Sequence, residues 1–185
     1  VLESAQRAFG DIPGFFVPGH PIAGTEKSGV GASFGELYQQ RRVILTPTQQ
    51  TDSHATNRVR AMWEAAGAQV FEMDPVHHDA VLAATSHLPH VLAYTLVDCL
   101  AKLDDRDEVF KYAAGGFLDF TRIASSDPVM WRDICLANGD AIELLIEYFI
   151  KDLQAVKTAV HTHDGDRLQE IFTSAKRARD RFADK

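Results

Sequence analysis

The pattern of apolar residues changes near Pro75, and this change constrains the fold more than any other feature. Before it, short apolar runs at 14–18, 43–46 and 69–73 are bounded by Gly, Pro and polar residues, as β-strands are. Between the last two runs, apolar residues recur at helical spacing and Gly67 follows as a stop signal. Strand, helix and strand in this order predict a βαβ unit and a piece of parallel sheet.

After Pro75 the periodicity is helical throughout. Apolar residues from 81 to 103 cover more than one helix face, with a bend expected at Pro89. A second helix is expected from the N-cap residue Asn138 to about 160, and a final amphipathic helix follows 164–166. Three apolar residues fall outside the main stripe of the second helix: Leu144, Tyr148 and Ile150. The additional apolar face of such a helix is expected to pack against another surface, and a second copy of the chain is the simplest partner.

The sequence therefore predicts a mainly α protein in two parts. Residues 1–74 are expected to be the C-terminal part of an α/β domain, and residues 75–185 an all-helical domain. With 19 Lys+Arg against 26 Asp+Glu, a net charge of −7 and no basic block, the composition argues against nucleic-acid binding.

Two cysteines and one apolar stretch indicate in which cellular compartment the chain is found and whether it associates with a membrane. Cys99 and Cys135 sit in apolar helical runs, which predicts buried thiols in a reducing, cytoplasmic compartment. The longest apolar stretch, 91–103, is interrupted by Asp98 and Lys102 and is shorter than the ~20 residues of a membrane-spanning helix. We therefore expect no membrane association.

The densest polar cluster lies at 20–29, directly after the first apolar run. It contains His20, Thr25, Glu26, Lys27 and Ser28. Ligands of open α/β sheets gather beyond the carboxyl ends of strands, so this segment is a candidate site. Pro21 restricts the backbone of His20 to extended conformations. A polar surface loop with a hydrogen-bonded histidine is an equally good interpretation of the residues alone.

A second histidine group comprises 77–79 and 87–90. His87 and His90 could share a helix face, and His78 or Asp79 could supply a third zinc ligand. Pro89 disturbs that spacing, and no H-E-x-x-H or C-x-x-C pattern is present. A capping or pocket-lining role is therefore favoured, and no metal is expected.

A third segment, 115–124, begins with two glycines and contains Arg122 among apolar residues. A buried guanidinium requires an anionic partner. Asp119, one turn earlier, is the partner that composition favours, and a substrate carboxylate is the alternative. The nearest approach to a dinucleotide fingerprint, 29–34, lacks the third Gly and follows no predicted strand.

Together, segments 20–29, 86–90 and 116–124 resemble the signature segments of the prephenate dehydrogenase family, which includes arogenate and cyclohexadienyl dehydrogenases. The resemblance implies a Rossmann-type NAD(P) domain followed by a helical domain that forms an intertwined homodimer. It also implies oxidative decarboxylation of prephenate to 4-hydroxyphenylpyruvate, or of arogenate to tyrosine, with possible tyrosine feedback. Residues 1–74 would then be the distal half of the nucleotide-binding domain.

The resemblance also implies roles for individual residues. His20 matches the histidine that takes the proton of the substrate 4-hydroxyl group, and Arg122 the arginine that holds a substrate carboxylate. The other matching pocket positions are His90, Thr25, Trp131, Glu26 and, from the second subunit, Gly115 and Asp119. The family's cofactor fingerprint precedes these segments, so the cofactor-binding residues are unknown and this chain alone is expected not to turn over. The alternative is a non-catalytic helical dimer that binds tyrosine or a related aromatic effector.

Overall fold

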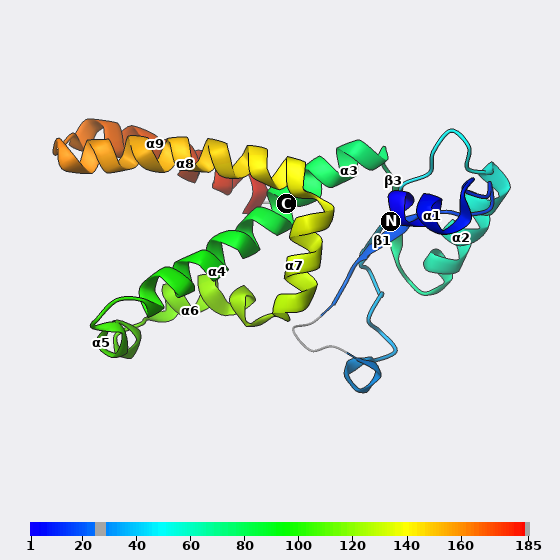
Figure 1. Ribbon diagram of the computed structural model, residues 1–185, viewed down its shortest axis with the longest axis horizontal. Helices are drawn as coiled ribbons and strands as arrows, with labels where there is room; N and C mark the ends of the chain where they lie inside the picture. The colour runs from blue at the N-terminus through cyan, green and yellow to red at the C-terminus, as the bar shows by residue number, and fades with distance from the viewer. Residues whose placement is uncertain (25–28, 184–185) are drawn as a thin grey trace. The chain divides into compact units, whose positions relative to one another are not determined.

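The computed structural model describes residues 1–24 and 29–183 (Figure 1). The chain divides into two compact units, Val1–Ala141 and Ile142–Lys185. The elements are α1 (Leu2–Phe9), β1 (Gly19–Ile22), η1 (Val30–Ala32), β2 (Arg42–Leu45), α2 (Ser53–Ala65), β3 (Gln69–Glu72), α3 (Pro75–Leu82), η2 (Ala83–His87), α4 (Leu88–Ala101), α5 (Arg106–Lys111), α6 (Gly115–Thr121), η3 (Arg122–Ser125), α7 (Pro128–Ala137), α8 (Gly139–His161) and α9 (Gly165–Ala183). The predicted fold class, mainly α with a small sheet near the N-terminus, is confirmed.

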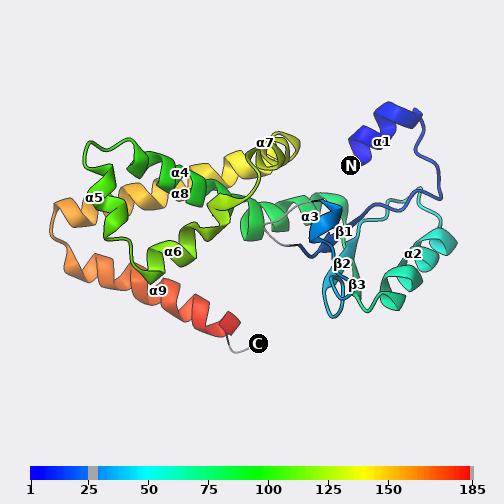
Figure 2. The ribbon, with the colours of Figure 1, turned by 90° about the horizontal axis from the view of Figure 1, so that it is seen from below.

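The sheet has the strand order β1-β2-β3, and α2 lies next to β3 (Figure 2). Strands β2 and β3 are parallel and joined through α2, so the predicted βαβ unit is confirmed. The Asp52 carboxylate accepts hydrogen bonds from the backbone N–H groups of His54 and Ala55 and so begins α2. Gly67, with φ of 84°, ends it. The core of the sheet lies on β2, where Val43 and Leu45 are fully buried.

The first predicted strand is misplaced. The apolar run at 14–18 is not a strand; β1 is Gly19–Ile22, and it pairs antiparallel with β2, with His20 opposite Ile44. The end of this run lies beside the end of β2, where the Thr46 N–H donates to the Pro18 carbonyl oxygen, and Pro18 itself has no N–H to donate to a ladder. Pro21 is tolerated since β1 is an edge strand. His20 therefore lies within a strand rather than in a loop beyond one.

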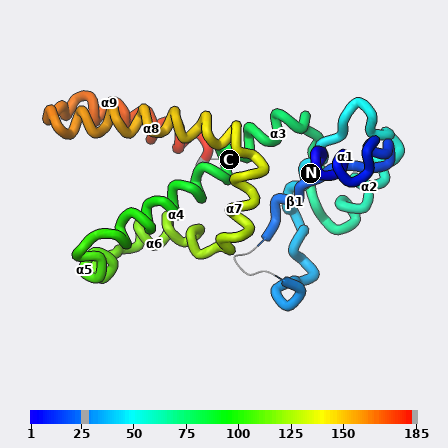
Figure 3. Tube along the Cα trace, viewed as in Figure 1, coloured from blue at the N-terminus to red at the C-terminus, as the bar shows by residue number. Residues whose placement is uncertain are grey.

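The helical run that contains Pro89 is continuous and has a local widening just before this residue. Helix α3 continues through η2, a π-helical turn, into α4, and the trace passes through without a break (Figure 3). Pro89 cannot donate to the carbonyl four residues earlier, and a π-turn accommodates this loss. The run Pro75–Ala101 has 27 residues and, by length and composition alone, could cross a membrane. It is longer than the stretch 91–103 considered from the sequence, so the expectation that every apolar stretch is too short for a membrane-spanning helix is wrong on length.

The helices of the first unit leave several apolar and sulfur-containing side chains accessible. Cys99 is exposed and Cys135 is only partly buried, so the prediction of two buried thiols is wrong for the single chain. Both lie on helices whose other faces pack inward, α4 and α7.

Asp127 caps α7 through the N–H groups of Val129 and Met130, and this places Trp131, 8% exposed, in the first turn.

The second unit contains α9 and most of α8. Ile142 and Ala159 are its buried apolar residues on α8. The three residues predicted to fall outside the apolar stripe, Leu144, Tyr148 and Ile150, are 47–59% exposed. This unit therefore presents large apolar side chains to its surroundings.

Candidate functional site

Two histidines from different elements meet in the first unit. Nδ1 of His20, on β1, lies 3.0 Å from Nε2 of His78, on α3, and their ring centroids are 5.2 Å apart. The pairing of β1 with β2 fixes the position of His20. Asp74 accepts hydrogen bonds from the N–H groups of Val76 and His77, and this cap fixes the first turn of α3. The fold thus joins residues 58 positions apart in the sequence.

A carboxylate extends this pair. Oδ1 of Asp79 lies 2.8 Å from Nδ1 of His78, whose side chain is only 14% exposed. Desolvation lowers the pKa of His20 below its usual 6.5; His78 adds to this effect and Asp79 opposes it. Part of the His20 side chain is exposed to solvent, and neighbouring groups desolvate the rest of its ring. His20 is therefore neutral at pH 7 and able to accept a proton.

His90 and Trp131 form a stacked pair. Their ring centroids are 3.6 Å apart with an interplanar angle of 19°, and Nδ1 of His90 lies 2.9 Å from the Ser86 carbonyl oxygen. A carbonyl only accepts, so Nδ1 of His90 donates and its Nε2 carries the lone pair. Burial lowers the pKa of His90, and the hydrogen bond to Ser86 opposes this shift. The stack thus holds a neutral imidazole against a large apolar ring.

The indole of Trp131 has an unusual polar feature. Its N–H is buried and, among the residues that the structure describes, has no hydrogen-bond partner. Leaving a buried donor unpaired costs about 1–3 kcal/mol. Such a group is a candidate for donation to a ligand acceptor.

Asn138 connects the two histidine groups. Its amide nitrogen donates to the carbonyl oxygen of Asp79 at 2.8 Å and lies 3.2 Å from Nδ1 of His87. The His87 ring lies edge-on to Trp131, at a centroid distance of 6.2 Å. Burial is the largest cause of the lowered pKa of His87, and His20 is the next. The fold therefore gathers one cluster from β1, α3, η2, α4 and α7.

Sequence reasoning named part of this cluster. It singled out His20, His90 and Trp131. It considered His78 and Asp79 as possible zinc ligands and favoured a capping or pocket-lining role for their group, and it considered Asn138 only as a helix cap. The adjacency of His78 and Asp79 was the available signal, but their pairing with β1 was not visible. Within 1–24 and 29–183, no group of three or more His, Cys, Asp or Glu residues is arranged to hold a metal ion.

The remaining predicted residues are placed as follows. Thr25 and Glu26 lie outside the described residues. Gly115 begins α6 and Asp119 lies on it, and both are exposed. In the part of the chain that the structure describes, nothing lies within 4 Å of a Cβ built at Gly115. Arg122 begins η3 and is exposed, so the premise that its charge is buried is wrong for the single chain. It stands at the junction where α6 ends, outside the regular part of that helix.

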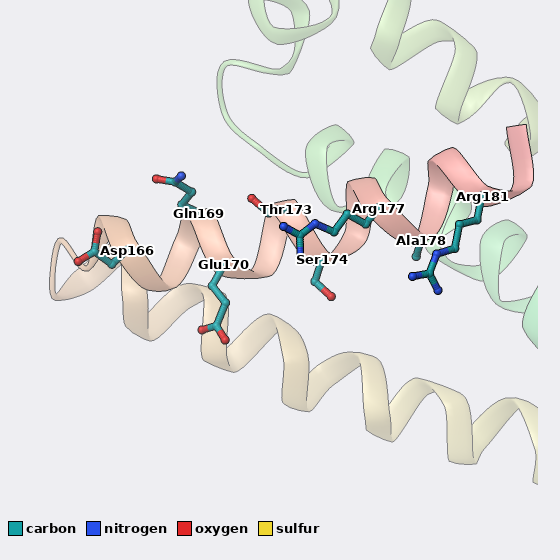
Figure 4. Close-up of a pocket in the computed structure, with 8 residues that line it drawn as sticks. All are labelled: Asp166, Gln169, Glu170, Thr173, Ser174, Arg177, Ala178 and Arg181. Atoms are coloured by element: carbon teal, nitrogen blue, oxygen red, sulfur yellow. The ribbon is translucent and has the colours of Figure 1, made fainter. Parts of the chain in front are cut away.

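The C-terminal unit has hollows of its own. One of about 740 Å³ is lined by α9 alone, and Figure 4 shows its side chains, from Asp166 to Arg181, spread along that helix. Another, of about 600 Å³, is lined by both α8 and α9. None of the predicted site residues lines either hollow.

Comparison with known proteins bears on both parts of the chain. Residues 74–174 match the family described as prephenate dehydrogenase, dimerization domain, and residues 4–72 match prephenate dehydrogenase, nucleotide-binding domain. The chain is 44% identical to cyclohexadienyl dehydrogenase of Zymomonas mobilis, over 88% of this chain and 56% of the relative. It is 41% identical to prephenate dehydrogenase of Bacillus subtilis, over 89% of this chain and 45% of the relative.

A solved structure is similar over nearly the whole chain. The structure of prephenate dehydrogenase from Aquifex aeolicus in complex with hydroxyphenyl propionate and NAD⁺ has a TM-score of 0.86 and 43% identity. The similarity covers 97% of this chain and 62% of that one. The chain spans about half the length of the curated relatives it matches.

Proposed function

Because the chain belongs to the prephenate dehydrogenase family, we propose that it forms the substrate-side part of an enzyme that oxidises and decarboxylates prephenate or arogenate. The product is 4-hydroxyphenylpyruvate from prephenate or tyrosine from arogenate. The observation that carries the proposal is the match of both family domains, in order, over 4–72 and 74–174. We keep 1–74 and 75–185 as the proposed domain boundaries.

The proposed hydride acceptor is NAD, the cofactor in the complex of the Aquifex aeolicus enzyme, with NADP as the alternative. Bound to the enzyme, it supplies the site that takes the hydride from the ring carbon bearing the hydroxyl group. Residues 29–34 do not fit a phosphate cradle, because they lack the third Gly of the dinucleotide fingerprint and Val30–Ala32 form the short 3₁₀ helix η1.

His20 is the proposed general base. Loss of hydride leaves a developing carbonyl at the hydroxyl carbon, and a neutral imidazole that takes the hydroxyl proton lowers the barrier. A positioned base contributes about 10²–10⁴-fold. The lowered pKa of His20 supports this role, since it keeps the imidazole unprotonated at neutral pH. Departure of CO₂ then restores an aromatic ring, and the phenol oxygen recovers a proton from His20.

The substrate-binding residues are proposed from the family resemblance. Arg122 holds a substrate carboxylate, and His90 and Trp131 line the pocket with Thr25 and Glu26. The unpaired buried indole N–H of Trp131 supports a pocket position, because it offers a donor to a ligand oxygen.

The assembly is proposed to be a homodimer. The match to a dimerization domain and the exposed apolar residues of α8 support it. Gly115 and Asp119 would then reach the pocket of the second subunit. Burial in the dimer, rather than in a lipid bilayer, is our proposal for the apolar run Pro75–Ala101. We also propose a cytoplasmic location without nucleic-acid partners, which two free cysteines and a net charge of −7 support.

The test uses the complete enzyme that contains this chain. With prephenate or arogenate and NAD or NADP, we expect one reduced nicotinamide per molecule of CO₂ released, and we expect the 185-residue chain alone to be inactive. A folded complete enzyme that reduces neither cofactor with either substrate would contradict the proposal. Tyrosine feedback would show as competitive inhibition by tyrosine. If tyrosine binds and no turnover occurs, the non-catalytic effector module is the better interpretation.

A further inference from the structure

Three side chains of the first unit form a row that the proposed base alone does not explain. Oδ1 of Asp79 contacts Nδ1 of His78 at 2.8 Å, and Nε2 of His78 contacts Nδ1 of His20 at 3.0 Å. Two of the three lie on α3 and the third on β1. Nδ1 of His20 therefore has a defined partner, and so do both ring nitrogens of His78.

The positions of the protons follow from the chemistry of these groups. An ionised carboxylate only accepts hydrogen bonds, so Nδ1 of His78 carries a proton and donates it to Asp79. A neutral imidazole has a single N–H, which leaves a lone pair on Nε2 of His78. Nδ1 of His20 must then be the donor in the His20–His78 bond. The lone pair of His20 is consequently on Nε2, the nitrogen that does not face His78.

The alternative protonation would disable the base. If His78 were doubly protonated, its Nε2 would donate to Nδ1 of His20, and Nε2 of a neutral His20 would carry the proton. That nitrogen could then not accept a proton from a hydroxyl group. The state of His78 thus decides whether His20 can act as a base at Nε2.

The carboxylate end of the row is also fixed. The backbone oxygen of Asp79 accepts from the Asn138 amide at 2.8 Å, and that amide lies 3.2 Å from His87. The groups that act electrostatically on His20 are His78 and Asp79, and His20 in turn acts on His87. Asp79 is the anion among them, so it favours the cation that His20 becomes on taking a proton.

We propose that His78 and Asp79 are positioning residues, which hold His20 in the Nδ1–H tautomer and direct its Nε2 lone pair at the substrate hydroxyl group. This inference rests on the proposed function, and it assigns a task to two residues outside the sequence-predicted site. In the step itself, the hydroxyl proton moves to Nε2 of His20 while the Nδ1 proton stays shared with Nε2 of His78. His78 changes neither its proton count nor its tautomer.

The kinetic test compares three variants of the complete enzyme. His78→Leu removes the acceptor, and we expect kcat to fall about 10- to 100-fold with KM nearly unchanged, because only part of a base's 10²–10⁴-fold contribution is lost. His78→Gln offers an amide oxygen to Nδ1 of His20 and should restore kcat to within about fivefold of the parent. His77→Leu is the matched control, since His77 is the exposed neighbour on α3; its kcat should equal that of the parent.

A spectroscopic test does not depend on turnover. In the complete enzyme labelled with ¹⁵N-histidine, at a pH above 7, Nδ1 of His20 should give the signal of a protonated nitrogen and Nε2 that of an unprotonated one. Signals are assigned by comparison with His20→Asn and His78→Gln. A protonated Nε2 on His20 overturns the proposal, as does parental kcat in His78→Leu. Failure of the parent to oxidise prephenate or arogenate would instead count against the proposed function, and the tautomer measurement would still decide the inference.

Discussion

Gly19 gives the sharpest test of how the sheet holds His20. A Cβ built at Gly19 lies 2.9 Å from Cδ2 of Leu45, which is closer than real Cβ atoms approach. Leu45 is fully buried and packs with Val43 and Ala68, so its methyl group has no free space to move into. Gly19→Ala should therefore push β1 away from β2, at the residue next to His20.

The size of the effect follows from two opposing contributions. Overpacking of a core costs about 1–3 kcal/mol. Replacing glycine by alanine in unstrained extended backbone stabilises by about 0.4–1 kcal/mol through the unfolded chain. The net loss expected for Gly19→Ala is therefore about 0–2.6 kcal/mol. Gly35→Ala is the control for the effect of glycine replacement on the unfolded chain, because no atom of the described residues lies within 4 Å of the added Cβ.

A double-mutant cycle isolates the clash. Leu45→Val deletes the Cδ2 atom and removes one CH₂ group in all, which by itself costs about 1 kcal/mol. In that background Gly19→Ala should no longer destabilise, which gives a coupling of about 1–3 kcal/mol between the two sites. Urea unfolding of the four proteins, followed by circular dichroism, measures it. Additivity within about 0.5 kcal/mol would refute the reasoning that Leu45 fixes the approach of β1.

Three further outcomes are expected. The folded-state pKa values of His20, His87 and His90 lie below the unfolded value of 6.5. Their contribution to stability is therefore complete above that pH and is lost as pH falls through the folded values. A urea midpoint that increases when the pH is lowered from about 7.5 to about 5.5 would contradict this. Tyr148, 59% exposed on α8, should lie in the proposed dimer interface, so Tyr148→Glu should shift the assembly toward monomer in light scattering, and an unchanged dimer mass would remove Tyr148 from the interface. Arg122→Gln should mainly raise KM in steady-state kinetics, and a change confined to kcat would contradict its proposed role in binding a carboxylate.

Elements with local stop and start signals were predictable from the sequence. Helix α2 was expected between the runs at 43–46 and 69–73 with Gly67 as its stop signal. It spans Ser53–Ala65, because Asp52 and Gly67 mark its ends chemically. The switch to helices after Pro75 was equally visible. In these segments the local preferences of the residues agree with the final fold.

The position of β1 could not be predicted in the same way. The apolar run at 14–18 has the composition of a strand, whereas Gly19–Ile22 contains a glycine, a histidine and a proline. What makes 19–22 a strand is its antiparallel register with β2, a contact between distant segments. Local pattern carries no information about such a partner.

The candidate site was also predictable only in part. His20, His90 and Trp131 were identified from motif resemblance, and the structure brings them into one cluster with His78, Asp79 and Asn138. The link between His20 and His78 joins residues 58 positions apart, so the sequence offered only the neighbouring letters at 77–79. The exposure of Arg122 could not be predicted, because apolar neighbours in the sequence do not by themselves bury a side chain in space.

The most direct test of the central claim is the pH dependence of kcat/KM for prephenate or arogenate oxidation, in the complete enzyme and in its His20→Asn variant. If neutral His20 is the base, kcat/KM of the parent should stay level above pH 6.5 and decline with acid as the imidazole takes a proton. His20→Asn should lower kcat by about 10²–10⁴-fold, with KM nearly unchanged, and abolish that decline. A variant that keeps the parental kcat and the same acidic decline would contradict the account.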